Sequence, residues 1–180
     1  MRKPWKALLI VLLVAVIGCL AIVGFHIIRN LAAGPAVPLG YFDGIDCNMR
    51  PRQVGKLLGE PVKVEDQMDL SETMTYRYEL KLDETEAVLR LSFVDDKWIS
   101  MAFLDADAGT RENAERLFAL WKDRIAEAYA SEEGYYCREL QTSADGSWKL
   151  ELGFQDGAVG TSAELTLDGS KITIRTDFCY

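Results

Sequence analysis

The sequence predicts an α+β fold in which helices pack on one face of an antiparallel sheet, preceded by a single transmembrane helix. Three observations predict it: an uncharged apolar run near the N-terminus, strand-like segments of period-two alternation, and two amphipathic helical segments among them. The 180 residues carry 20 Lys and Arg against 28 Asp and Glu, a net charge of -8. This acidic balance argues against a nucleic-acid partner.

The membrane is the first partner that the sequence predicts. Residues 7–28 are almost entirely apolar and contain no formal charge. A helix of this length spans ~33 Å, enough to cross the hydrocarbon core of a bilayer. Three basic residues precede the run and only Arg29 follows it; the three are Arg2, Lys3 and Lys6. The positive-inside bias then places residues 1–6 in the cytoplasm and the C-terminal part outside the membrane.

Two alternatives concern the same run. Val16-Ile17-Gly18-Cys19 resembles a lipobox, in which Cys19 would carry the lipid, although the apolar character continues through Phe25. A cleaved secretory signal would have a shorter apolar region of roughly 7–15 residues. The length of the run favours an uncleaved signal anchor at 7–28, with a lipoprotein and ordinary cleavage as the other possibilities.

A linker is expected over residues 29–40, where two prolines and two glycines interrupt any helix and only Arg29 is charged. Residues 41–180 then form the extracytoplasmic domain. We expect it to consist of two units, 48–104 and 110–178, each beginning with a helix and continuing as strands. This is an internal repeat of element order, not of sequence.

The first unit begins with a short helix over residues 50–58. Pro51 suits a first helical position, and Gly59 suits the residue that follows a helix. Apolar and polar residues then alternate over 76–82, 89–93 and 99–103, which predicts three strands with one covered face. The polar pairs Asp83-Glu84 and Asp95-Asp96 predict the turns between these strands.

The second unit begins with a longer helix over residues 110–132, ending before Gly134. One stripe of this helix is apolar and predicts packing on a sheet. The stripe consists of Ala114, Leu117, Phe118, Trp121, Ile125 and Tyr129. Strands are expected over 148–154, 163–167 and 172–178, because Asp-Gly pairs favour tight turns between them. Residues 135–141 predict a further strand, but the sequence does not show which of its side chains point to the core.

A family resemblance rests on the segment from Asn48 to Pro61. It resembles the G-M-T-x-x-Q-V-x-x-x-L-G-x-P signature of BamE-type (SmpA/OmlA) envelope proteins over about residues 48–104. The matching residues are Met49, Gln53, Val54, Leu58, Gly59 and Pro61. Asn48 stands in place of Gly, and Arg50 replaces the Thr that would cap the helix. The resemblance implies a fold similar to the β-lactamase inhibitory protein, a binding module with helices on a sheet. It does not carry over the outer-membrane assembly role, which needs a lipid anchor.

Catalytic arrangements are not evident in the sequence. The single histidine, His26, lies in the apolar run, so the outer domain offers neither a His-containing triad nor His metal ligands. Asp105 to Thr110 superficially resembles a dehalogenase loop and an EF-hand, but Thr110 comes one residue late and Arg116 stands where an EF-hand needs Glu. The segment is better explained as a strand-to-helix loop with helix-capping residues. We expect no enzyme, no cofactor and no metal.

The function predicted from these observations is a membrane-anchored, extracytoplasmic, non-enzymatic interaction module. It would act in cell-envelope assembly or maintenance, with another envelope protein as its partner. The alternative is a small-molecule or peptide sensor or inhibitor domain on the outer face of the membrane.

The cysteines outside the apolar run allow one intramolecular disulfide. We favour Cys137–Cys179, because both should lie at the same end of the second sheet unit, with Cys47–Cys179 as second choice. A strict strand meander would hold the favoured pair about 14 Å apart, and a disulfide tolerates at most ~7 Å between Cα atoms. In that case Cys179 meets Cys47, or all three cysteines stay reduced.

Overall fold

The computed structural model describes residues 37–67, 73–156 and 159–179. Two helices and nine strands lie in these ranges. They are α2 Pro51–Leu58, β1 Lys63–Gln67, β2 Thr73–Leu82, β3 Thr85–Val94, β4 Trp98–Asp107, α3 Arg111–Tyr129, β5 Tyr136–Cys137, β6 Gln141–Thr142, β7 Trp148–Asp156, β8 Val159–Asp168 and β9 Lys171–Cys179.

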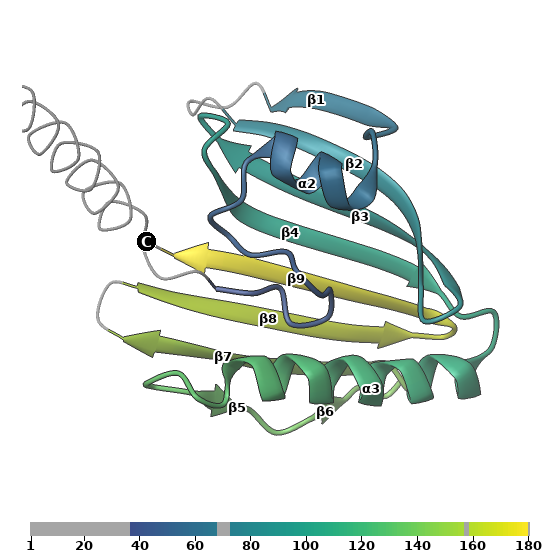
Figure 1. Ribbon diagram of the computed structural model, residues 1–180. Coiled ribbons are helices and arrows are strands. Elements are labelled where there is room, and N and C mark those ends of the chain that lie inside the picture. Colours follow the sequence, from purple (N-terminus) through teal and green to yellow (C-terminus); the bar gives the residue numbers. More distant parts are fainter. Residues whose placement is uncertain (1–36, 68–72, 157–158, 180) are drawn as a thin grey trace, which may run out of the picture. The chain divides into compact units, whose positions relative to one another are not determined.

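The nine strands form one antiparallel sheet with the order β1-β2-β3-β4-β9-β8-β7-β5, and β6 also pairs with β7. The two halves of the chain meet where β4 pairs with β9, in a register that sets Leu104 opposite Ile174. Helix α3 packs against β7, β8 and β9, and α2 packs against β2. Both helices lie on the same side of the sheet (Figure 1). The predicted α+β class, an antiparallel sheet with helices packed against it, is confirmed.

The core lies between the sheet and the helices. The six residues of the apolar stripe on α3 are all buried, and Trp121, Ile125 and Tyr129 are completely inaccessible to solvent. Opposite them lie the inward-pointing residues of β3, β4, β7, β8 and β9. These include Leu89, Leu91, Leu104, Leu150, Leu152, Leu165, Leu167, Ile172 and Ile174. Burial of this apolar surface is the main favourable term in folding.

The segment before α2 contributes to the same core. Val37, Leu39 and Ile45 are buried there, and the segment folds back on itself through a bridge between Pro38 and Asp46. A Cβ atom on Gly40, whose φ is +79°, would lie 2.9 Å from the Cα atom of Ile125 in α3. A close approach of this kind requires glycine. Residues 37–40, expected in the linker over 29–40, therefore belong to the folded part of the chain.

Turns explain the hairpins on each side of β3. Asp83 and Glu84 connect β2 to β3 with φ values of 48° and 67°, and Asp95 and Asp96 follow β3 with φ values of 52° and 53°. Two consecutive residues with positive φ match the twist of the strands that they join, and Asp tolerates this conformation better than most residues. The β2–β3 connection consists of these two residues alone, whereas Lys97 adds a third residue before β4. The predicted polar turns are confirmed.

Three elements differ from the sequence prediction. Strand β1 is additional, and the single strand expected over residues 135–141 is replaced by two strands of two residues each, β5 and β6, the second of which extends to Thr142. Helix α3 ends at Tyr129, short of the expected residue 132. Gly134 lies in the following turn with φ +72°, where a Cβ atom would come 2.1 Å from the carbonyl oxygen of Gln155.

The predicted anchor at 7–28, the alternative lipid site at Cys19 and the start of the linker lie outside the described residues. Neither of the two helices that the structure describes combines the length and the apolar character needed to cross a membrane.

Candidate functional site

The two faces of the sheet differ in character. Leu104 and Ile174 are register partners on β4 and β9 and are fully buried. The next pair, Asp105 and Thr173, is partly exposed and points to the opposite face, because successive strand residues alternate between faces. We call this second face the open face. Its charged residues include Lys63, Glu65, Arg77, Glu79, Arg90, Asp105, Lys149, Glu164, Arg175 and Asp177.

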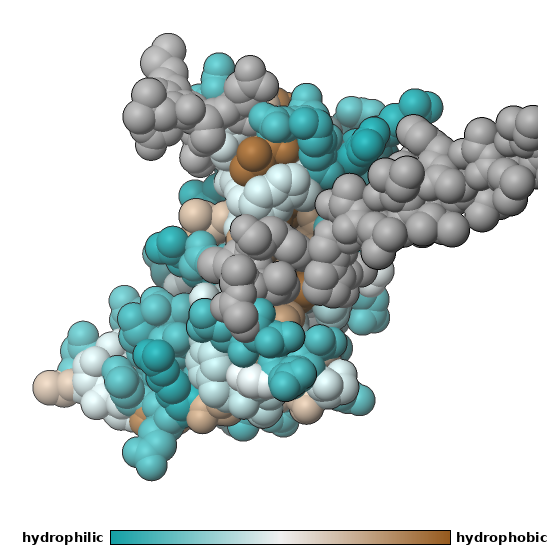
Figure 2. All heavy atoms as spheres, turned by 90° about the vertical axis from the view of Figure 1, so that its left-hand side faces the viewer, coloured by the Kyte–Doolittle hydropathy of each residue, from teal (hydrophilic) through white to brown (hydrophobic). Residues whose placement is uncertain are grey.

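Ion pairs connect most of these residues. Arg77 pairs with Glu79 at 3.0 Å, and Arg175 pairs with Asp177 at 2.9 Å. The other pairs are Lys63 with Glu65, Arg90 with Asp105, and Lys149 with Glu164. Their side chains are substantially exposed, so each pair contributes at most about 1 kcal/mol. The described surface is also largely hydrophilic when seen from the left-hand side of Figure 1, with hydrophobic areas confined to small patches (Figure 2).

Arg90 lies at the centre of this charge pattern. Its guanidinium lies over the ring of Phe103, 4.6 Å from the centroid, and also forms the ion pair with Asp105. Arg77 is the direct register partner of Arg90 on the neighbouring strand. Like charges directly opposite each other are destabilising, and the carboxylates of Glu79 and Asp105 offset this repulsion.

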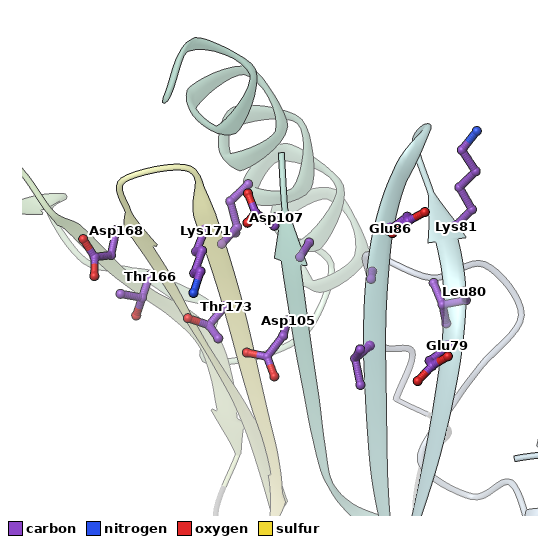
Figure 3. A pocket seen from close by; sticks show the side chains of 14 residues that line it. Glu79, Leu80, Lys81, Glu86, Asp105, Asp107, Thr166, Asp168, Lys171 and Thr173 are labelled. Carbon is purple, nitrogen blue, oxygen red and sulfur yellow. The ribbon is translucent and has the colours of Figure 1, made fainter. Parts of the chain in front are cut away.

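A hollow of about 970 Å³ lies at the end of the sheet that carries the β2–β3 and β8–β9 turns. We call it the terminal hollow (Figure 3). Val88 contributes apolar surface between Glu79 and Asp105, its register partners on the two adjacent strands. The lining residues are Glu79, Leu80, Lys81, Glu86, Ala87, Val88, Asp105, Ala106, Asp107, Thr166, Asp168, Lys171, Ile172 and Thr173.

The terminal hollow is acidic, with five carboxylates against two lysines among its lining residues. Asp107 accepts hydrogen bonds from the Ser170 hydroxyl at 2.7 Å and from the Gly109 backbone N–H at 3.0 Å. These bonds, the hydroxyl first, hold the pKa of the Asp107 carboxyl below its usual value. Acidic walls around apolar surface fit a cationic group that also carries apolar atoms.

A second, smaller groove of about 300 Å³ lies between α3 and the β5–β6 region. Trp148 forms one wall, with its ring edge-on to Phe118 and the guanidinium of Arg111 4.9 Å from its centroid. Cys137 and Leu140 are exposed at this groove. The surface is largely apolar, and two of its aromatic residues, Phe118 and Trp148, pack against each other.

The strand order bears directly on the predicted disulfide. Cys137 on β5 pairs with Leu152 on β7, which pairs with Ala163 on β8, which pairs with Thr176 on β9. This meander separates Cys137 from β9 by three strand spacings, about 14 Å. Cys137 is exposed and forms no disulfide. The favoured pairing with Cys179 therefore does not fit this strand order, in which β8 and β7 lie between β9 and β5.

The second choice, Cys47–Cys179, stays a prediction, because the side chain of Cys179 lies outside the described residues. The backbone carbonyl of Cys47 accepts a hydrogen bond from the Ile99 N–H at 2.7 Å, at the start of β4. Strand β9 ends beside the start of β4, since the two strands are antiparallel with Met101 opposite Asp177. The two cysteine backbones thus belong to the same end of the sheet.

The residues of the signature segment hold α2 in place. Val54 is buried, and Met49 packs against the core. The Gln53 side-chain oxygen accepts a hydrogen bond from the Arg50 backbone N–H at 2.9 Å, although the Arg50 side chain itself gives no cap. Gly59 ends the helix with φ +85°. The other two, Leu58 and Pro61, are partly buried, and none of the six lines the terminal hollow.

Asp105 to Asp107, expected in a strand-to-helix loop, instead form the end of β4, whereas Thr110 has the capping role that the sequence predicts. The Thr110 hydroxyl accepts a hydrogen bond from the Asn113 N–H at 3.2 Å and caps α3. Among the described residues, no group of three or more His, Cys, Asp or Glu is placed to hold a metal ion. His26 lies outside the described residues.

Comparisons with known proteins identify no relative of this chain. A scan against models of protein families, a search of curated proteins and a search of solved structures each found no match.

The terminal hollow is the feature that the sequence analysis missed. Its lining comes from β2, β3, β4, β8 and β9, which are joined only by the sheet register. The available signal was the alternation of charged residues with the apolar residues of each strand. That alternation identifies an outward face but does not show which strands are neighbours.

Proposed function

We propose that this chain is a non-enzymatic interaction module, held at a membrane by residues 7–28, with its folded domain on the extracytoplasmic side. The observation that supports an interaction role is the open face of the sheet. Seven strands, β1 to β4 and β7 to β9, present charged side chains there, and the face includes a hollow large enough for several side chains of a partner.

Envelope assembly or maintenance is the setting that we propose for this module. The resemblance of residues 48–61 to BamE-type proteins supports it, as does the position of α2, which begins at Pro51 and is followed by Gly59 in the way the signature implies. The partner that we propose is another envelope protein.

Site-specific photocrosslinking in intact cells tests this function. A photoreactive amino acid at Thr166, in the terminal hollow, should capture a discrete protein partner. The same residue at Glu127, exposed on α3, serves as the matched control. Equal capture at both positions, or none at Thr166, would contradict a partner on the open face.

A second candidate function, a sensor or inhibitor domain for a small molecule or peptide, is favoured by the terminal hollow itself. Its volume of about 970 Å³ lies in the range of ligand sites. A ligand present at 100 times its dissociation constant would stabilise the native state by about 2.7 kcal/mol. Thermal-shift screening of cationic compounds should reveal such a ligand. The shift should disappear in a Val88→Arg variant, because the longer side chain fills the hollow.

A further inference from the structure

The two edges of the sheet are built differently. At one edge, β5 and β6 have two residues each and are interrupted by residues 138–140. At the other edge, β1 runs for five residues in unbroken register with β2, from Lys63 opposite Arg77 to Gln67 opposite Thr73. Within the described part of the chain, no strand pairs with the outer side of β1. Such an edge offers backbone N–H and C=O groups to another strand.

Apolar side chains are exposed at the same edge. Val64 in β1 is 43% exposed, and Val62, which precedes the strand, is 55% exposed. Val64 is flanked by Lys63 and Glu65, which point to the open face and form an ion pair with each other. Residues 63–65 of this edge are therefore positive, apolar and negative in order. When two copies of such a segment align antiparallel, the positive residue of each lies opposite the negative residue of the other.

Antiparallel pairing of two β1 strands about a two-fold axis allows only a few registers. Residues directly opposite each other in an antiparallel pair point to the same face of the sheet. The two-fold axis must therefore lie between one β1 residue and the same residue of the second copy, and we name each register after that residue. An axis at Lys63, Glu65 or Asp66 sets like charges directly opposite each other, which is destabilising. An axis at Val64 sets Val64 opposite its copy and sets Lys63 opposite Glu65 of the second copy, twice by symmetry. Only this register combines an apolar centre with two complementary ion pairs.

We propose that β1 is a self-association edge, at which a second copy of this chain adds its own β1 antiparallel with Val64 on the two-fold axis. The sheet then continues from one copy to the next. The dimer leaves the open face of each copy available, so this inference is independent of the proposed partner there. The contact is short, and it is a reversible interface, because it is smaller than those of permanent dimers.

Charge variants test the register. In a Lys63→Glu variant each copy sets Glu against Glu, and in a Glu65→Lys variant each sets Lys against Lys. Each single variant should raise the dimer dissociation constant about tenfold, from two opposed pairs. A mixture of the two variants is complementary at both positions and should dimerise as well as the unaltered chain. Both side chains are about half exposed, so the variants should keep the native melting temperature.

The measurement is co-purification of the full-length chain carrying two different tags, in detergent, followed by sedimentation to obtain dissociation constants. Val64→Cys in native membranes provides a second readout, because it should give a cross-linked dimer on oxidation while Leu120→Cys on α3 should not. Three results would overturn the proposal: a monomeric unaltered chain, a Lys63→Glu variant that dimerises normally, or a mixture that associates no better than the single variants.

Discussion

Replacing Asp83 by Asn should lower the free energy of unfolding by about 2 kcal/mol. The Asp83 carboxylate accepts a hydrogen bond from the Trp121 indole N–H at 2.7 Å and two from the Arg124 guanidinium, both at 2.8 Å. These bonds tie the β2–β3 turn to α3. The Asp83 side chain is 21% exposed and that of Arg124 is 39% exposed. Solvent therefore screens part of the interaction, and we expect a loss in the middle of the range for charge-assisted bonds.

Two substitutions of Asp83 separate the contribution of its carboxylate charge from that of the turn conformation. Asn tolerates the φ of 48° at this position, so Asp83→Asn removes the charge but keeps the turn conformation. Asp83→Ala removes both and should cost about 1 kcal/mol more. In a double-mutant cycle, Asp83→Asn and Arg124→Met should show a coupling free energy of at least about 1 kcal/mol. Denaturant unfolding of the chain in detergent, followed by tryptophan fluorescence, measures each value.

The pH dependence provides an independent check. Burial alone would raise the pKa of the Asp83 carboxyl, but the hydrogen bonds from Trp121 and Arg124 outweigh it and hold the pKa below its usual value. A carboxyl with a depressed folded-state pKa stabilises the protein above its unfolded pKa of about 4 and loses this effect as pH falls through the folded value. The stability difference between the unaltered chain and Asp83→Asn should therefore shrink below about pH 4. A difference that is absent at pH 7, or a coupling near zero, would refute this account.

Three further predictions concern single positions. Gly134→Ala should lower the melting temperature markedly, because the added methyl group collides with a β7 carbonyl oxygen and the φ of +72° disfavours Ala. Thr110→Ala should cost about 1 kcal/mol in denaturant unfolding, because it removes the cap of α3. In the native chain, a maleimide should label exposed Cys137 rapidly and should not label buried Cys47, as peptide mass spectrometry can show. The same mapping without reductant tests the Cys47–Cys179 bond, and alkylation of both cysteines after unfolding would show this pairing wrong.

Elements with a clear period were predictable from the sequence. Each of these elements buries one face, which produces the apolar stripe of α3 and the alternation in β3, β4, β7, β8 and β9. The hydrophobic period of a segment arises from this burial and therefore predicts the element. Strand β1 was missed because Lys63, Glu65 and Asp66 surround a single valine, and an exposed edge strand has no face to bury. Residues 135–141 were misjudged for the same reason, since they are largely exposed and pair only in short pieces.

The order of the strands in the sheet could not be predicted from the sequence. The order in which β9 inserts beside β4 fixes which charges meet in the terminal hollow and which cysteines are distant. Local alternation is the same for any strand order. The favoured Cys137–Cys179 pairing depended on the one property, strand order, that periodicity does not encode.

The buried start of the described chain constrains how the proposed anchor and domain work together. Val37 is 3% exposed and belongs to the core, so the fold begins no later than this residue. If residues 7–28 span the membrane, only residues 29–36 connect the span to the fold, and this connection reaches at most ~29 Å when fully extended. The domain would then stay near the membrane surface, where two copies on one membrane meet at raised effective concentration. A short edge such as β1 can be sufficient for association under these conditions, because the membrane has already reduced the freedom that the two copies lose on pairing.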